Sequence, residues 1–355
     1  MTRFSEPMPV GKVPPEILDR TVFRKIRRSD SRILVTPGTG EDCGIIDLGS
    51  QFRVLSCDPV TGASNDVGKL AVHVSCNDIA SAGLRPFGLM VTLLLPPGST
   101  PSDLDKTMSD ICDAAADLDI SILGGHTEVT DAVSRTIVTI CVIAFADHAE
   151  NGDPADISGN SGNSGLPVIR TGGARPGDLL IMTKTAGLEG TAVIANDHAD
   201  ELEPVLGKET VSKARAFMDR ISVMKEGIIG GRCGVSSMHD VTEGGIFGAA
   251  YEIAAASGCG IILEKDKIPV AEETVSVCSY YGISPYQLIS SGCMAMTIKE
   301  KNAPLLLETL RSENIPAAVI GRMTEEKEYL IVSEQSGKKT REPLLPPGSD
   351  ELYKI

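Results

Sequence analysis

The chain of 355 residues is short of basic side chains and has no long apolar segment. It contains 33 Lys and Arg against 48 Asp and Glu, a formal net charge of −15. Duplex DNA and anionic membranes select basic surfaces, so this charge argues against both as the main partner. No run approaches the ~18 apolar residues of a membrane-spanning helix. The first residues lack the apolar segment of a signal peptide. We therefore expect a cytoplasmic protein that binds neither nucleic acid nor membrane.

The common signatures of nucleotide and hydrolase sites are missing as well. The sequence has no Walker A loop and no dinucleotide-binding glycine fingerprint. It also has no nucleophile elbow and no H-E-x-x-H motif. None of the nine cysteines forms a C-x-x-C pair, which argues against a zinc cluster. We expect the cysteines to be small buried side chains in a reducing compartment.

The composition is that of a folded protein, and the length suggests two domains. Hydrophobic residues make up 42% and charged residues 23% of the chain. Predicted strands and helices are mixed in both halves, which indicates an α/β or α+β fold. A stretch rich in glycine and asparagine separates the halves. The expected parts are a leader (1–30), an N-terminal domain (31–149), a linker (150–173), a C-terminal domain (174–335) and a polar surface tail (336–355).

Carboxylates stand beside glycines at the ends of several predicted elements. Asp42 lies in a tight turn, Asp58 ends a strand, and Asp240 ends a strand that opens into a glycine-rich turn. Asp78 lies in the last turn of a predicted helix over 66–82, where the macrodipole disfavours a negative charge unless a cation compensates it. Singly, each acid is explained by a cap, a surface charge or a Lys or Arg partner. Together they suggest a Mg²⁺ site.

Two glycine turns and one lysine are further candidates. The turn at 242–245 precedes a helix, so its N–H groups could bind an anion; close helix packing is the alternative. Gly124 and Gly125 follow a short predicted strand over 120–123 in the same way, and His126 comes next. Alone, His126 is explained as a turn histidine. Lys69 could meet a phosphate, or be a solvated helix lysine.

In this order and spacing, the motifs resemble those of the AIR synthase-like (PurM-like) superfamily, from about Gly11 to the tail. The stretch 40–46 is similar to the G-D-D-A-A-V turn of that family, and 56–58 to its T-D strand end. Residues 66–86 are closest to the form found in the hydrogenase maturation factor HypE. The stretch 238–248 matches the motif of the C-terminal domain.

The resemblance implies a two-domain fold whose N-terminal sheet pairs with that of a second subunit to form a barrel, giving a homodimer. It also implies ATP bound together with Mg²⁺. The implied metal ligands are Asp42, Asp58, Asp78 and Asp240. The implied nucleotide or substrate contacts are Asp42, Asp58, Lys69, Asn77, Gly124, Gly125, Thr242, Gly244 and Gly245, with Asp240 and His126 as catalytic candidates.

The sequence also departs from several of the proteins that it resembles. HypE ends in a cysteine, whereas the last cysteine here is Cys293, so the HypE reaction on a C-terminal thiol is not expected. Residues 20–40 lack the cysteine of the catalytic loop of selenide water dikinase. The D-x-S-D-G-L pattern of thiamine monophosphate kinase is matched only loosely.

Three functions remain open. The first is an enzyme that uses ATP to activate an oxygen of an unidentified small substrate or partner group, by HypE-like, synthase-like or kinase-like chemistry. The second is a dimer that binds ATP without chemistry. The third is a scaffold that docks on another maturation protein.

Overall fold

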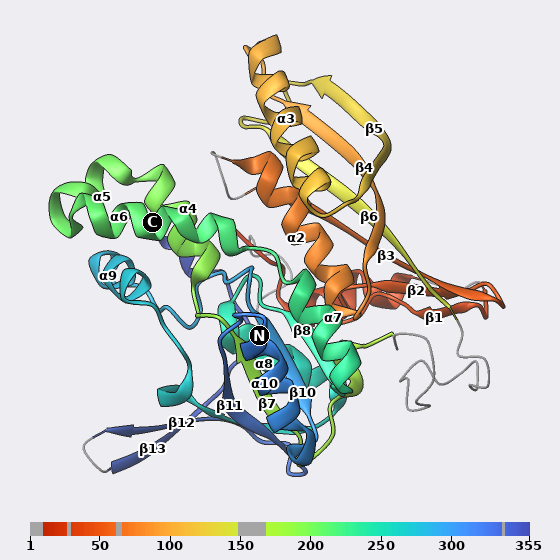
Figure 1. The fold of residues 1–355 in the computed structure, drawn as a ribbon, viewed down its shortest axis with the longest axis vertical. Coiled ribbons are helices and arrows are strands. Elements are labelled where there is room, and N and C mark those ends of the chain that lie inside the picture. Colours follow the sequence, from red (N-terminus) through yellow and green to blue (C-terminus); the bar gives the residue numbers. More distant parts are fainter. Residues whose placement is uncertain (1–9, 27–29, 62–65, 148–167, 336–337) are drawn as a thin grey trace.

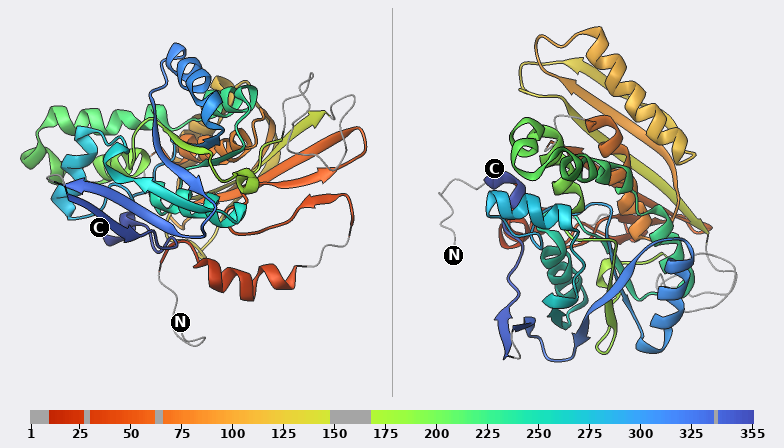
Figure 2. Two further views of the ribbon diagram at one scale, coloured as in Figure 1. Left: turned by 90° about the horizontal axis from the view of Figure 1, so that it is seen from below. Right: turned by 60° about the vertical axis from the view of Figure 1, so that its left-hand side comes forward.

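The computed structural model describes residues 10–26, 30–61, 66–147, 168–335 and 338–355. These residues form two sheets, each with its own helices, which confirms the mixed α/β fold with two sheet domains (Figure 1). The two further views show the same two lobes, the N-terminal one in red to yellow and the C-terminal one in green to blue (Figure 2). Among the described residues, no helix is long and apolar enough to cross a membrane.

The N-terminal sheet has the strand order β1-β2-β3-β6-β4-β5, with helices α2 and α3 on one face. Burial alternates along β3, as expected for a strand with one covered face. A capping box formed by Thr100 and Asp103 begins α3. The elements are α1 (Pro15–Thr21), β1 (Ile33–Val35), β2 (Gly44–Asp47), β3 (Gln51–Val60), α2 (Val67–Ser81), β4 (Pro86–Leu95), α3 (Pro101–Asp117), β5 (Ser121–Val129) and β6 (Ile137–Asp147).

The C-terminal sheet has the strand order β13-β12-β9-β11-β7-β10-β8. Its strands are β7 (Leu179–Thr183), β8 (Ser237–Asp240), β9 (Gly260–Glu264), β10 (Met294–Ile298), β11 (Ala317–Thr324), β12 (Tyr329–Gln335) and β13 (Lys338–Pro343). Its helices are α4 (Leu188–Asp197), α5 (Ala199–Leu206), α6 (Lys208–Arg215), α7 (Met224–Cys233), α8 (Gly245–Ser257), α9 (Glu272–Tyr281) and α10 (Ala303–Ser312).

The two halves meet where α2 packs against α7 and β8. A Cβ on Gly227 would lie 2.1 Å from the carbonyl oxygen of Ala80, so glycine lets the backbones of α7 and α2 touch. Beside this contact, the buried Asn77 amide donates to the carbonyl of Ile221 (2.9 Å) and accepts from the N–H of Val223 (2.9 Å). This contact places the end of α2 beside the end of β8.

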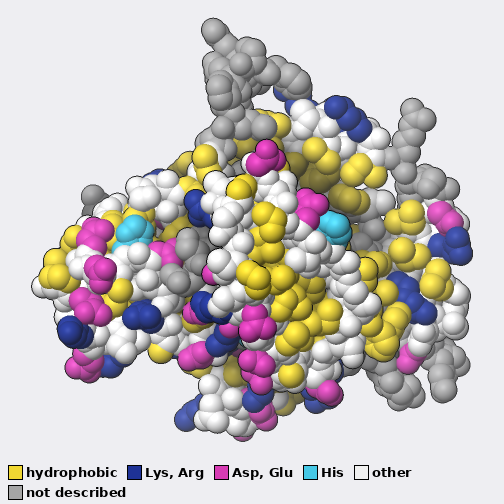
Figure 3. Space-filling model, turned by 90° about the horizontal axis from the view of Figure 1, so that it is seen from above, with side chains coloured by type: hydrophobic (Ala, Val, Ile, Leu, Met, Phe, Trp, Pro, Cys, Tyr) yellow, Lys and Arg dark blue, Asp and Glu magenta, His cyan; other side chains and the backbone are white. Residues whose placement is uncertain are grey.

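The other face of the N-terminal sheet carries exposed apolar side chains. Phe87 and Met90 of β4 are 56% and 47% exposed, and Leu123 of β5 is 50% exposed. Hydrophobic side chains also gather on the molecular face seen from above (Figure 3). This sheet therefore presents several large apolar side chains to solvent.

Three expectations from the sequence are wrong. Cys57 and Cys141 are directly opposed on β3 and β6 and form a disulfide, because the sheet pairs residues 84 positions apart. The tail is not a surface segment throughout, since Leu344 and Asp350 are buried. The short strand expected at 120–123 continues to 129, because Gly124 and Gly125 pair with β4 in parallel register.

Candidate functional site

Four aspartates converge where the two halves meet. Asp42 precedes β2, Asp58 lies in β3, Asp78 lies in the last turn of α2, and Asp240 ends β8. Their negative charges all act on the thiol of Cys43: burial raises the pKa of this thiol well above its ordinary value, and the four carboxylates raise it further. The fold therefore brings all four predicted metal ligands into one region, in which Asp42 and Asp240 lie close enough to share a metal ion.

Asp78 and Asp240 are the buried members of this cluster. The hydroxyl of Ser56 donates to Asp78, whose pKa is raised well above its ordinary value by burial first and then by Asp240 and Asp58. Asp240 is fully buried, and neither of its carboxylate oxygens has a hydrogen-bond partner among the described residues. Burial, followed by the charge of Asp42, raises the pKa of Asp240 to about 8. Burial without a partner favours the neutral acid, and a divalent cation would reverse that preference.

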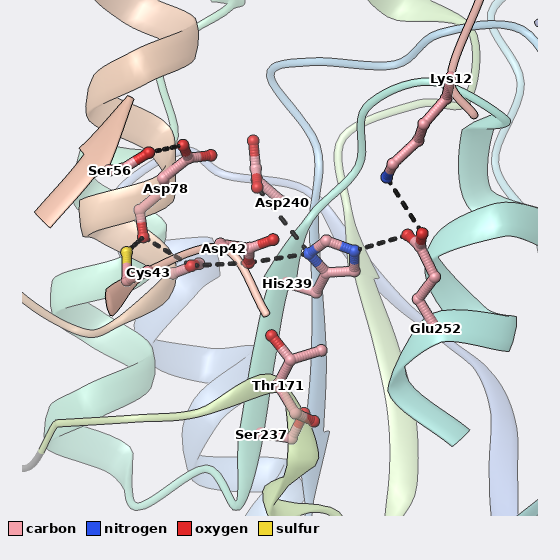
Figure 4. A network of polar contacts seen from close by, with 11 residues as sticks. Lys12, Asp42, Cys43, Ser56, Asp78, Thr171, Ser237, His239, Asp240 and Glu252 are labelled. Carbon is pink, nitrogen blue, oxygen red and sulfur yellow. Dashed lines mark hydrogen bonds and ion pairs between the residues drawn. The ribbon is translucent and has the colours of Figure 1, made fainter. Parts of the chain in front are cut away.

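Asp42 is held by a buried histidine. His239 Nδ1 lies 2.9 Å from Asp42 Oδ2, and His239 Nε2 lies 2.9 Å from Glu252 Oε2 (Figure 4). Burial opposes the charging of His239, but the ion pairs with Asp42 and Glu252 outweigh it and raise its pKa well above the ordinary value. With a carboxylate at each nitrogen, His239 orients Asp42, and its ligand atom also lies within metal-binding distance of Asp42 and Asp240.

Glu252 is in turn paired with a lysine of the N-terminal leader. Lys12 Nζ lies 3.0 Å from Glu252 Oε1. Burial would raise the pKa of Glu252, but Lys12 and His239 outweigh it and lower the pKa to about 2. Glu252 thus stays ionised in a buried position where an unpaired carboxyl would be neutral.

Sequence reasoning missed the roles of His239, Glu252 and Lys12. One signal was visible: Glu252 is the only charged residue of α8, whose other residues are apolar or small. His239 was part of the recognised motif, but nothing in the sequence gave it a partner. No sequence signal joins Lys12 to Glu252, which lies 240 positions away.

Four other predicted residues lie outside this cluster. Lys69 pairs with Asp219 (Nζ–Oδ1 2.6 Å). His126 lies exposed on β5 and contacts only its neighbour Glu128 (3.2 Å) among the described side chains. Gly124 and Gly125 belong to the same strand, and a Cβ on Gly125 would lie 1.7 Å from the carbonyl oxygen of Val91. Close strand pairing therefore accounts for Gly125 without a phosphate.

The predicted cofactor contact Asn77 also has another task, because both ends of its amide bind backbone groups of residues 221–223. Its side chain therefore joins the two halves of the chain.

The glycine turn at 242–245 faces the chain's own tail. The N–H of Gly244 donates to Asp350 Oδ2 (2.7 Å), and the N–H of Gly245 to the carbonyl of Thr242 (3.0 Å). Asp350 also accepts from two further backbone N–H groups, those of Ile289 and Leu352. The anion that this turn binds in the structure is thus a carboxylate of the tail, which explains why the tail is buried there.

A pocket of about 110 Å³ opens beside the cluster. Lys12, Asp42 and Glu252 contribute its charged side chains, together with Glu41. Its apolar wall comes from the leader and the tail: Val13, Pro15, Leu18, Phe23 and Pro347. Leader and tail therefore enclose a space next to Asp42.

Comparison with known proteins gives consistent matches. Residues 40–146 match the N-terminal domain, and residues 175–333 the C-terminal domain, described as AIR synthase related protein. A putative hydrogenase expression/formation protein of Methanocaldococcus jannaschii is 27% identical over 340 residues, 93% of each chain. The carbamoyl dehydratase HypE of Cupriavidus necator is 26% identical over 280 residues, 77% of this chain and 72% of its own.

Two solved structures share the fold. A chain of the HypE–HypF complex has a TM-score of 0.71 at 22% identity, and the match covers 93% of this chain and 99% of that one. HypE in complex with ATP has a TM-score of 0.63 at 20% identity, covering 95% of this chain and 96% of that one.

Proposed function

The chain belongs to the AIR synthase related family, and on that premise we propose that it is a Mg²⁺-dependent enzyme that uses ATP to activate an oxygen of a small substrate or partner group. One observation carries the proposal. Asp240 is fully buried with two unpartnered carboxylate oxygens, at the meeting point of three other aspartates. A divalent cation held there would give both oxygens a partner.

Asp42, Asp58, Asp78 and Asp240 would hold this cation. Carboxylate oxygens are ligands that Mg²⁺ prefers, and Mg²⁺ in such sites commonly binds substrate phosphates as well. When bound, the cation neutralises phosphate charge during phosphoryl transfer. The chain's own residues would position the carboxylates: Ser56 donates to Asp78, while Ser81 and His239 donate to Asp42. A related protein, HypE, has been solved in complex with ATP, which supports a nucleotide ligand.

We also propose that two copies pair through the apolar face of the N-terminal sheet. Leu55, Phe87, Met90 and Leu123 are exposed on that sheet. A second copy would bury them, and it would also cover β5 with Gly124, Gly125 and His126. This pairing would explain why these three residues lie apart from the aspartates within one chain. Sedimentation or light scattering tests it: a monomer at micromolar concentration contradicts it.

The first test is a thermal unfolding midpoint with ATP, with Mg²⁺ and with both. A ligand at ~100 times its Kd stabilises the native state by about 2.7 kcal/mol, which shifts the midpoint by a few degrees. We expect a rise that requires both components and is lost in Asp58→Asn. No shift at millimolar ATP, or the same shift in Asp58→Asn, contradicts the proposal.

A second candidate, an ATP-binding dimer without chemistry, is favoured by the docked tail. HypE is described as a carbamoyl dehydratase. In this chain the carboxylate of Asp350 accepts from the N–H of Gly244 and so occupies the glycine turn. Phosphate release in the presence of candidate carboxamides, phosphate esters and amines separates the two. Bound ATP without turnover for any of them supports the binding module. Copurification with another maturation protein would support a scaffold role.

A further inference from the structure

An unbroken chain of polar contacts links the N-terminal leader to Asp42. It runs from Lys12 through Glu252 and His239, over three contacts of 2.9–3.0 Å (Figure 4). Glu252 and His239 have side chains only 3% exposed, whereas that of Lys12 is 39% exposed. The chain therefore begins at the surface, beside the pocket, and ends at a carboxylate of the acidic cluster.

The two carboxylates in this series of contacts use their oxygens differently. Glu252 binds Lys12 through Oε1 and His239 through Oε2. Asp42 receives His239 and the hydroxyl of Ser81 (3.0 Å) on Oδ2. Both contacts fall on Oδ2, so neither of them occupies Oδ1. The contacts thus restrict the carboxylate to one orientation about its own axis.

The leader is anchored at the point where Lys12 enters. The backbone N–H of Lys12 donates to Glu243 Oε2 (2.9 Å), in the glycine turn. The hydroxyl of Ser349 donates to the carbonyl of Val10 (2.6 Å), and Gly11 lies against the ring of Tyr353. Leader, turn and tail therefore hold the Lys12 backbone in place, so that its ammonium group meets Glu252.

We propose that Lys12, Glu252 and His239 are positioning residues that fix the carboxylate of Asp42 for a divalent cation, and that docking of the leader completes the cation site. This inference rests on the proposed function, because it assigns the residues that prepare one of its four metal ligands. Outer-shell partners of this kind orient the ligand itself, and their loss costs about 10–100-fold in metal affinity.

A positioning role and a purely electrostatic role of Lys12 predict opposite changes in cation affinity when Lys12 is replaced. Lys12 is a cation near an acidic cluster, so removing its charge alone would tighten the binding of another cation. If Lys12 acts by holding Glu252, and through it His239 and Asp42, then removing it loosens cation binding instead. Lys12→Met therefore separates the two roles, and Lys12→Arg keeps both charge and donor.

The first measurement is Mn²⁺ binding without nucleotide, followed by electron paramagnetic resonance. We expect Glu252→Gln and Lys12→Met each to weaken binding by about tenfold. Lys12→Arg should stay close to wild type. Lys213→Met serves as the control, because Lys213 forms an exposed ion pair with Glu209 elsewhere. The double variant Lys12→Met/Glu252→Gln should be no weaker than the worse single variant, since both break one chain. Equal or tighter Mn²⁺ binding in Lys12→Met overturns the proposal.

The second measurement needs no metal. The protein has five histidines, so ¹⁵N-histidine labelling gives few ring N–H resonances to follow. The downfield signal of the His239–Asp42 contact is expected to shift or broaden in Lys12→Met and to remain in Lys12→Arg and Lys213→Met. An unchanged signal in folded Lys12→Met overturns the positioning role. If that signal responds but the wild type binds neither Mn²⁺ nor Mg²⁺–ATP, the positioning chain stands and the proposed function fails.

Discussion

Glu252 and Asp240 are two buried carboxylates on either side of His239, and their pKa values move in opposite directions. The pKa of Glu252 falls to about 2, whereas that of Asp240 rises to about 8. Burial raises both. The difference lies in the partners, because Glu252 has Lys12 and His239, while Asp240 has no hydrogen-bond partner among the described residues.

This comparison shows how one small region can hold one carboxylate in a fixed position and leave another open to a cation. The paired acid is ionised, fixed and unavailable, so it serves the geometry of its neighbours. Asp240, which accepts no hydrogen bond among the described residues and lies 3.9 Å from His239, has a raised pKa, and a bound cation would favour its ionised form. Perturbed pKa values cluster at functional sites for this reason, although structural ion pairs perturb them too.

Replacing Asp240 tests this comparison with the largest expected effect. Asp240→Asn removes a direct metal ligand, so we expect cation affinity to fall by more than ~100-fold, beyond the range for outer-shell partners. The same change should raise the unfolding midpoint of the metal-free protein, because a buried carboxyl no longer has to be kept neutral. Calorimetric unfolding and cation titration measure both effects. Asp105→Asn, on the exposed side of α3, is the control. A lower metal-free midpoint contradicts our reading of Asp240.

Replacing Glu252 should lower the unfolding midpoint, in contrast to replacing Asp240. Glu252→Gln leaves the charges of His239 and Lys12 without their shared partner, and breaking a buried pair from one side costs about 3 kcal/mol. We expect the unfolding midpoint to fall by several degrees at pH 7. Glu300→Gln, whose partner Arg322 is exposed, should change stability by less than about 1 kcal/mol. Equal effects of the two variants would show that the buried chain contributes nothing special.

Glu189 extends the comparison to a third buried acid. It lies in the first turn of α4, its Oε2 has no partner among the described residues, and burial raises its pKa to about 7 from 4.5. Folding therefore disfavours the ionised form of Glu189. The neutral form costs no stability below about pH 4.5, and the free energy of unfolding falls as the pH rises from there through about 7. Glu189→Gln should remove this loss, with a gain on the order of 3 kcal/mol at pH 8. Denaturant unfolding at pH 5 and pH 8 measures it, with exposed Glu308→Gln as the control. A gain that is the same at both pH values would rule out this origin.

The pKa of Asp350 lies between those of Glu252 and Asp240, and its replacement has the smallest expected effect on stability. Burial raises its pKa to about 6, although three backbone N–H groups oppose that rise. Asp350→Ala leaves those donors without their acceptor, at a cost of about 1–3 kcal/mol. Because Gly244 is one of the donors, the tail should also loosen, which limited proteolysis would detect as earlier cleavage after residue 344. A tail as resistant as in the wild type would show that Pro347 and Tyr353 hold it without Asp350.

Local sequence patterns predicted much of the fold correctly. The helix predicted over 66–82 is α2, since apolar spacing acts within a few residues. The polar tail predicted at 336–355 contains a strand, β13. The β13 strand exists because it pairs with β12, and such pairing is not encoded locally.

The candidate site also has residues that the sequence could identify and contacts that only the fold shows. Asp42, Asp58, Asp78 and Asp240 could be named from sequence because each stands at the end of an element or in a turn, in a recognisable motif. Their roles as metal ligands, like the other site assignments, remain predictions. The glycine turn at 242–245 shows the limit of such reasoning. Its geometry does bind an anion, but the anion is the carboxylate of Asp350, about a hundred positions away.

The sequence by itself determined the class of fold, the family and the acidic residues, because these depend on short-range periodicity, charge and motif spacing. Only the tertiary structure decided which acids are paired and which are not. Lys12 and His239 hydrogen-bond to Glu252 and lower its pKa, whereas Asp240 accepts no hydrogen bond among the described residues, its nearest cation is His239 at 3.9 Å, and its pKa is raised. Charge state in a buried site depends on the neighbours within a few ångströms, and folding alone brings distant residues that close.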